Sequence, residues 1–208
     1  MLTELARVTG LSEPHVPRQL GSLEEEDLLR RSRRRAVEVD WPALLRARAS
    51  EYGLLRTNTD ATMLAPRGAG AVADLLRDDP GGIDERVGGR IAVTGSWAAA
   101  AVAPEAVGGQ LMLYVPRAAV QTAAQTLGLI PAELGANVIL LEAADPVVFA
   151  RSREVDGLRQ VALSQLAVDC LGGTGRMPAE GEALLAYMAD HVGDWRVPNL
   201  DDLDRLSA

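Results

Sequence analysis

Residues 90–116 constrain the fold more than any other part of the chain, because they combine two apolar runs with a sharp break between them. The first run, Ile91–Thr94, is short and rich in β-branched residues, and it ends at Gly95. The alanine-rich segment that follows has high helix propensity and is ended by Pro104. The second run, Leu111–Val115, has the length and composition of a buried strand. The stretch therefore predicts a strand, a tight turn, a helix and a second strand, which together form the nucleus of an α/β sheet.

The turn between the first strand and the helix consists of Gly95 and Ser96. Gly95 can adopt the backbone angles that a sharp strand-to-helix turn requires. The Ser96 hydroxyl is expected to cap the helix by accepting from a backbone N–H group. A strand that ends in Gly-Ser, followed by a helix and a second strand, resembles the opening of the nucleotidyltransferase fold.

In active nucleotidyltransferases, as the resemblance implies, the second strand carries two carboxylates one residue apart that hold magnesium and the nucleotide triphosphate. Alternate residues of a strand share a face, so two acids at that spacing can share one metal ion. The corresponding run, Leu111–Val115, contains no acid, and Glu105 lies before the strand. We therefore expect a catalytically dead relative, with no catalytic residue, no metal and no cofactor, in which Gly95 and Ser96 are the remnant of the motif.

The net charge of −8 is unevenly distributed along the chain. Through residue 50 the arginines slightly outnumber the acids, whereas the remainder is strongly acidic. The nine arginines are Arg7, Arg18, Arg30, Arg31, Arg33, Arg34, Arg35, Arg46 and Arg48. A basic head on an acidic body is compatible with a two-part DNA-associated protein. Two plainer explanations stay open: the absence of lysine reflects GC-rich coding DNA, and the arginine block is a solvated turn.

The first forty residues resemble the end of a winged helix-turn-helix. Apolar spacing predicts a short helix over Leu2–Val8, and Ser12 is expected to cap a second helix. Val37–Val39 alternates like a strand and follows the arginine block. The resemblance implies a recognition helix over Glu13–Leu20 and a wing at Arg30–Arg35. The implied DNA-binding residues are His15, Arg18, Gln19, Arg30, Arg31, Arg33, Arg34 and Arg35.

Two features depart from a complete winged helix. With Ser12 as the cap, Pro17 falls just beyond the tolerant first turn, which predicts a lost hydrogen bond and a bend. The chain also starts at what would be the second helix of the family, so the apolar residues that the first helix covers are expected to need another cover. These are Leu2, Leu5, Val16 and Leu20. The candidates are the helix after Trp41, the body domain, or a second copy in a two-fold dimer.

The rest of the chain reads as mixed strands and helices, which indicates an α+β protein with an α/β body. We expect domains at 1–40 (partial winged helix-turn-helix), 41–60 (connecting helix and linker) and 61–208 (nucleotidyltransferase-like). The expected helices cover residues 43–51, 69–77, 118–127, 164–171 (capped by Ser164) and a last one from Pro178, and the expected strands lie near 62–64 and 138–142. Asp78–Gly89 is expected to be a mobile loop. Asp156-Gly157 predicts a hairpin turn between strands near Val147–Phe149 and Leu158–Ala162.

Four further features in the C-terminal part carry weaker signals for chemistry. Asp169 is interpreted as a paired structural acid, with a leftover third carboxylate as the alternative. Cys170 has no histidine in its motif, so it is not expected to act as a nucleophile. The loop Gly172–Arg176 lacks the lysine of a phosphate-binding loop and is interpreted as a helix end. His191 is expected to place a favourable charge at a helix C-terminus.

The single cysteine excludes an internal disulfide and a cysteine-based zinc site, which fits a reducing compartment. The start of the sequence has no apolar signal core, and no run reaches the roughly twenty apolar residues that span a membrane. We therefore expect a cytoplasmic protein without a membrane partner.

The whole layout resembles the AbiEi family of antitoxins from type IV toxin–antitoxin systems. The resemblance is carried by the winged head, the connecting helix, VTGSWAAAAVAP, LMLYVP, NVILLE and VDGLRQVALSQLAVDCL. It implies a bacterial, non-catalytic transcriptional regulator that binds the promoter of its own operon. It also implies a cognate nucleotidyltransferase toxin, which the antitoxin counteracts without forming a stable complex. The alternative is a degenerate regulator that acts as an interaction or dimerisation module without binding DNA.

Overall fold

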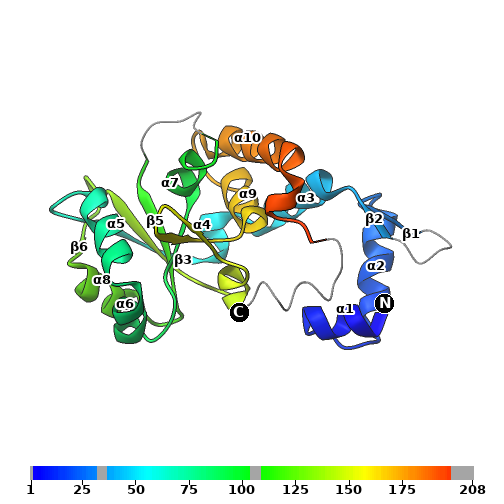
Figure 1. The fold of residues 1–208 in the computed structure, drawn as a ribbon, viewed down its shortest axis with the longest axis horizontal. Helices are drawn as coiled ribbons and strands as arrows, with labels where there is room; N and C mark the ends of the chain where they lie inside the picture. Colours follow the sequence, from blue (N-terminus) through cyan, green and yellow to red (C-terminus); the bar gives the residue numbers. More distant parts are fainter. Residues whose placement is uncertain (1, 32–36, 104–108, 198–208) are drawn as a thin grey trace. The chain divides into compact units, whose positions relative to one another are not determined.

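A computed structural model describes residues 2–31, 37–103 and 109–197 (Figure 1). The protein is α+β, as the sequence predicts, with a two-stranded sheet and a seven-stranded sheet. Residues Ala49–Trp195 form one compact unit, the body, and residues Met1–Arg48 belong to a second unit, the head. The division falls within helix α3 (Trp41–Tyr52). No helix among the described residues is long and apolar enough to cross a membrane.

The head consists of two helices and a β-ribbon. Its elements are α1 (Leu2–Thr9), α2 (His15–Glu25), β1 (Leu29–Arg31) and β2 (Val37–Val39). The two strands pair antiparallel, with Leu29 opposite Val39, which agrees with the predicted ribbon. Ala6, Val16 and Leu29 are buried. Of the four apolar residues expected to need another cover, Val16 is buried, Leu5 and Leu20 are half-buried, and Leu2 is 41% exposed.

Helix α2 begins two residues later than its sequence suggests. Pro14 occupies the N-cap position, and no side chain caps the helix there, so the predicted Ser12 cap is wrong. Ser12 contributes its carbonyl instead, which accepts from the His15 amide at 2.8 Å. Pro17 is then the third helical residue, where an amide proton would have no partner within the helix. The predicted loss of a hydrogen bond at Pro17 is therefore wrong, because the proline lies in the tolerant first turn.

The body is built on a mixed sheet with the strand order β6-β3-β7-β5-β4-β9-β8. The strands are β3 (Thr59–Leu64), β4 (Ala92–Thr94), β5 (Leu111–Val115), β6 (Ile130–Pro131), β7 (Val138–Glu142), β8 (Arg153–Val155) and β9 (Leu158–Gln160). β5 runs parallel to β7, and β4 runs parallel to β9, while the other neighbours are antiparallel. The predicted pair β4 and β5 lies near the centre, and every residue of both strands is buried.

The helices of the body are gathered in two groups (Figure 1). Helices α7 (Gly95–Ala100), α9 (Leu163–Leu171) and α10 (Met177–Asp190) pack on one another, as do α5 (Ala69–Asp78), α6 (Pro80–Val87) and α8 (Val120–Leu127). The short helix α4 is Leu54–Thr57. The predicted cap at Ser164 is wrong, because α9 starts at Leu163 without a side-chain cap. The stop at Gly128 is confirmed by its left-handed φ of +65°.

The predicted loop over Asp78–Gly89 is wrong, because most of it is helix α6. The Asp79 carboxylate caps this helix by accepting from the Gly82 amide at 3.0 Å, and Pro80 opens its first turn. Gly88 ends it in the left-handed conformation, with φ +78°. The composition of the segment, with four glycines, indicates a loop, but the cap, the proline and the glycine that follows Val87 determine a helix.

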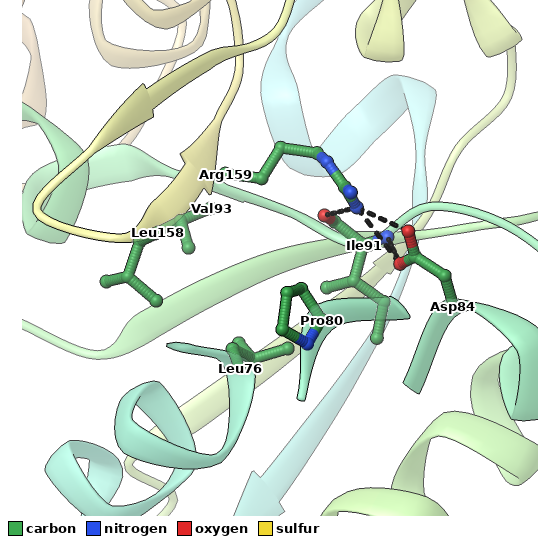
Figure 2. A pocket seen from close by; sticks show the side chains of 7 residues that line it. All are labelled: Leu76, Pro80, Asp84, Ile91, Val93, Leu158 and Arg159. Atoms are coloured by element: carbon green, nitrogen blue, oxygen red, sulfur yellow. Dashed lines mark hydrogen bonds and ion pairs between the residues drawn. The ribbon is translucent and has the colours of Figure 1, made fainter. Parts of the chain in front are cut away.

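Asp84 connects helix α6 to the sheet (Figure 2). Its carboxylate accepts from the Ile91 amide at 3.2 Å, and Arg159 Nη1 lies 3.0 and 2.7 Å from its two oxygens. The same Nη1 atom also donates to the Ile91 carbonyl at 3.3 Å. The cavity beside this cluster measures about 20 Å³, which is room for one water molecule and too little for a ligand.

The hairpin predicted at Asp156-Gly157 is confirmed. Both residues have positive φ, +50° and +72°, as the twist-compatible two-residue turn requires. The strands that it joins are β8 and β9. The predicted strand near Val147–Phe149 is wrong, because these residues form part of the 3₁₀ helix η1 (Pro146–Phe149).

Candidate functional site

The Gly95–Ser96 turn lies where β4 passes directly into α7. Gly95 has φ +68°, which confirms its predicted role in the turn. A Cβ atom at this position would lie 2.7 Å from the Sδ atom of Met112. Gly95 therefore provides both the left-handed backbone and the close approach of the turn to β5.

Ser96 does not cap helix α7, so that prediction is wrong. Thr94 occupies the N-cap position, and no side-chain hydrogen bond caps the helix. The Ser96 hydroxyl instead donates to Glu180 Oε2 at 2.6 Å, which ties α7 to α10. Glu180 is only 5% exposed, and Arg176 Nε lies 3.0 Å from its other oxygen as an ion pair without the angles of a hydrogen bond. The serine of the motif is thus part of a structural contact.

None of the five residues of β5 is acidic, and two of them, Met112 and Tyr114, lie on the same face of the strand. Both side chains are buried, with 7% and 0% of their surface exposed. Met112 pairs with Thr94 in the sheet and packs against Gly95, while Tyr114 is directed toward α9. Within the described ranges, no group of three acidic, histidine or cysteine side chains is arranged to hold a metal ion.

Asp169 lies behind this turn and is fully buried. Its carboxylate accepts three hydrogen bonds, from Thr94 Oγ1 at 2.5 Å, Gln165 Nε2 at 2.7 Å and Tyr114 Oη at 3.0 Å. Burial raises the pKa of Asp169 to about 7, although the three donors act in the opposite direction. The observed contacts are those of a paired structural acid, which was the favoured interpretation of the sequence.

A chain of buried polar groups continues from Asp169 and was not predicted. The hydroxyls of Tyr114 and Tyr52 lie 2.7 Å apart, and Asn58 Nδ2 donates to the Tyr52 hydroxyl at 2.7 Å. The side-chain oxygen of Asn58, Oδ1, accepts from the Ala144 amide at 3.2 Å. Burial is also the main reason why the pKa of Tyr114 is raised far above its ordinary value. The network joins residues that are distant in sequence, so no local sequence pattern predicts it.

The remaining candidate residues of the body, Cys170, His191 and the loop after α9, are in contacts that support the fold. Cys170 is fully buried, and burial raises the pKa of its thiol well above the ordinary value, which disfavours a thiolate nucleophile. His191 follows α10, and its ring stacks on Tyr187 with centroids 4.0 Å apart. The loop after α9 places Arg176 beside Glu180, as described above.

The head exposes one face of helix α2. His15, Arg18 and Gln19 follow the spacing i, i+3, i+4 of a single helix face, and all three are exposed. Val16 lies on another side of the helix and is buried. Helix α2 therefore presents the three predicted DNA-contacting side chains together.

The β-ribbon divides the predicted wing residues. Arg30 is exposed on β1. Arg31 forms an ion pair with Glu24 at the end of α2, and this hydrogen bond lowers the pKa of the Glu24 carboxyl. Arg33, Arg34 and Arg35 lie outside the described residues, as does the end of the chain from residue 198.

The chain matches no protein-family model, no curated protein and no solved structure. A functional assignment therefore depends on the residues and geometry described above.

Proposed function

We propose that the protein is a non-catalytic, DNA-binding transcriptional regulator and antitoxin similar to the AbiEi family of type IV toxin–antitoxin systems. The observation that carries this proposal is the exposed face of α2, with His15, Arg18 and Gln19 side by side. A β-ribbon follows the helix in the chain and exposes Arg30. This element order and this placement of basic and amide side chains support a winged helix-turn-helix.

In this proposal the side chains of α2 and of the ribbon have different tasks. Arginine and glutamine can read base edges in the major groove, because each offers paired donors or a donor and an acceptor. Arg18 and Gln19 are the candidates for such contacts. Arg30 is the candidate for a phosphate contact, which contributes affinity and salt dependence but no sequence preference.

The body supports the non-catalytic part of the proposal. The strand, Gly-Ser turn, helix and strand unit is present, and β5, the strand on which the resemblance places the metal-binding acids, contains no acid. A nucleotidyltransferase-like body without its acids suits an antitoxin whose cognate toxin is a separate nucleotidyltransferase. We propose that the relation to this toxin is functional, through control of expression and of its effect, without a stable complex.

The test is fluorescence anisotropy of the full chain with the duplex upstream of its own gene and with a scrambled duplex of the same length. Specific binding that Arg18→Ala and Gln19→Ala reduce toward the scrambled level supports the proposal. Arg30→Ala is expected to lower the slope of log K against log salt by about one unit. Arg67→Ala, which removes an exposed arginine of the body, is the matched control and leaves the slope unchanged. Equal binding of the two duplexes contradicts the proposal.

A second function, an interaction or dimerisation module without DNA binding, is favoured by the apolar residues around α1. Leu2 and Leu11 are 41% and 40% exposed. A module that contacts a partner or a second copy of the chain would bury such exposed apolar side chains in its interface. Absence of DNA binding, together with self-association that depends on concentration, supports this second function over the first.

A further inference from the structure

A pocket opens at one edge of the seven-stranded sheet, at the opposite end of β4 from the Gly95–Ser96 turn. The residues just before β4, just after β5 and just after β7 line it. β5 and β7 run parallel and β4 runs antiparallel to β5, so these three connections reach the same edge. The carboxyl ends of parallel strands in open α/β sheets are where ligands commonly bind.

The pocket is large enough for a small molecule. Its volume is about 360 Å³, within the range of roughly 300–1,000 Å³ that ligand pockets occupy. The cavity beside Asp84, at about 20 Å³, is far smaller. Of these two cavities, only the one at the strand ends can accept a ligand.

The wall of the pocket is mainly apolar. Six of its eight lining residues have no side chain that can form a hydrogen bond, namely Gly89, Pro116, Ala143, Ala144, Pro146 and Phe149. A Cβ atom on Gly89 would lie 2.9 Å from Pro116 Cγ, so the glycine allows these two parts of the wall to approach. The Phe149 ring is held edge-on by Tyr114, with centroids 6.4 Å apart and an interplanar angle of 77°. This wall suits the flat body of an aromatic molecule.

Arg90 and Arg117 are the other two lining residues, and both are exposed. They come from different connections, one before β4 and one after β5. No acid lines the pocket, and within the described ranges neither guanidinium takes part in an ion pair. Guanidinium groups bind carboxylates through paired hydrogen bonds. The charged part of the pocket therefore calls for an anionic group on the ligand.

We propose that this pocket binds a small organic anion with an aromatic body, of the class of the aromatic carboxylates. A nucleotide also carries an anionic group, but its ribose hydroxyls would be buried against a wall of prolines and alanines without side-chain partners. The anion contacts Arg90 and Arg117, and the ring lies against Phe149. This site is independent of DNA binding by the head, so either proposal can fail without the other.

The test uses 2-naphthoate and its neutral analogue 2-naphthamide, titrated into the full chain by isothermal calorimetry. We expect the acid to bind with a dissociation constant of about 0.1–1 mM, as a ligand of this size allows, and the amide about tenfold more weakly. Arg90→Ala and Arg117→Ala should each weaken binding of the acid by about fivefold and leave the amide unchanged. Phe149→Leu should weaken both ligands alike, and Arg67→Ala is the control for general loss of positive charge.

Each of four outcomes overturns the proposal. The first is equal binding of acid and amide, and the second is no binding of either at about 5 mM. The third is that Arg67→Ala weakens the acid as much as Arg90→Ala does. The fourth is tighter binding of AMP than of 2-naphthoate, which would assign the pocket to nucleotides. Both arginine side chains are exposed, so their replacement by alanine should leave the fold intact. Circular dichroism of the two variants checks this and separates a loss of binding from a loss of fold.

Discussion

The hydroxyl of Tyr114 donates a hydrogen bond of 3.0 Å to Asp169, a carboxylate that is fully shielded from solvent. The two residues come from the central strand β5 and from helix α9, so this bond fixes the helix on the sheet. The second Asp169 oxygen accepts from Thr94 on β4. In the region where the resemblance implies a metal site, buried side chains thus form a network with one another.

The first prediction concerns the pH dependence that Asp169 gives to stability. Its pKa is about 7 in the folded protein, against an ordinary value of 3.8. Between these values the native state holds a proton that the unfolded chain has lost, so the free energy of unfolding falls as pH rises. The fall amounts to roughly 4 kcal/mol from pH 4 to pH 7, and it levels off above the folded pKa.

Asp169→Asn removes this titration while it keeps an acceptor oxygen for Tyr114. Urea unfolding of both proteins at pH 5 and pH 8 measures the difference, and other titrating groups cancel between them. The wild type should lose more stability toward pH 8 than the variant does. An identical pH dependence of the two proteins would show that Asp169 does not titrate in this range.

The second prediction concerns Gly95. Alanine there would be held at φ +68°, and its Cβ would meet Met112 Sδ at 2.7 Å. We expect Gly95→Ala to lower the free energy of unfolding by roughly 2–4 kcal/mol. Gly70→Ala is the control, because Gly70 lies in α5 with nothing within 4 Å of its added Cβ, and it should be neutral or stabilising. A Gly95→Ala variant as stable as the wild type contradicts the argument.

The sequence predicted the elements that carry strong local signals. The strand, Gly-Ser turn, helix and strand unit, the hairpin at Asp156-Gly157 and the helix that Gly128 ends all follow from local backbone chemistry. Helix α6 was not predicted from the sequence, because the glycines of the segment, Gly81 and Gly82 among them, indicate a loop more strongly than the Asp79 cap indicates a helix. The cap predicted at Ser96 was wrong because a tertiary partner, Glu180, lies 84 residues away and takes the hydroxyl.

In the candidate sites, too, features set by local sequence could be predicted and features set by tertiary contacts could not. The exposed face of α2 follows from helical spacing, so His15, Arg18 and Gln19 could be grouped from the sequence. The pairing of Arg31 with Glu24 and the pocket between Arg90 and Arg117 could not be predicted. The ion pair and the pocket both depend on how strands and helices pack in three dimensions. The spacing of residues along a helix or a strand does not determine that packing.

The third prediction is that the protein transfers no nucleotide to RNA or protein. The strand on which the resemblance places the metal-binding carboxylates, β5, contains no acid. The measurement is magnesium-dependent labelling from radioactive nucleoside triphosphates, with a heat-killed sample as the control. Labelling above that control would overturn the proposed loss of catalysis.

The fourth prediction follows from the ion pair between Glu24 and Arg31. Glu24→Gln frees the guanidinium for phosphate, so affinity for DNA should rise by about threefold to tenfold at low salt, and the salt slope should steepen by up to about one unit. Glu25→Gln changes the net charge equally and alters an exposed residue of the same helix. If both variants raise affinity by the same factor, the effect is one of net charge and Arg31 has no special part.

The last prediction concerns the apolar surface around α1. Leu2 is 41% exposed, and Leu5 and Leu20 are half-buried. Burying a fully exposed leucine side chain gains roughly 1.5–3 kcal/mol, so completing the burial of each of these partly covered side chains gains a fraction of that, beside the 5–15 kcal/mol that stabilise a typical domain. A second copy of the chain could supply that cover, and a two-fold dimer would also suit a palindromic operator.

Light scattering of the wild type, Leu5→Glu and Thr3→Glu tests this idea. We expect a dimer at micromolar concentration that Leu5→Glu dissociates while its circular dichroism stays that of a folded protein. Thr3→Glu adds the same charge at an exposed position of α1 and controls for repulsion between the copies. A wild-type monomer at this concentration, or equal dissociation by both variants, excludes Leu5 as part of a dimer interface. The exposed apolar side chains of α1 would then remain in contact with water in the native monomer.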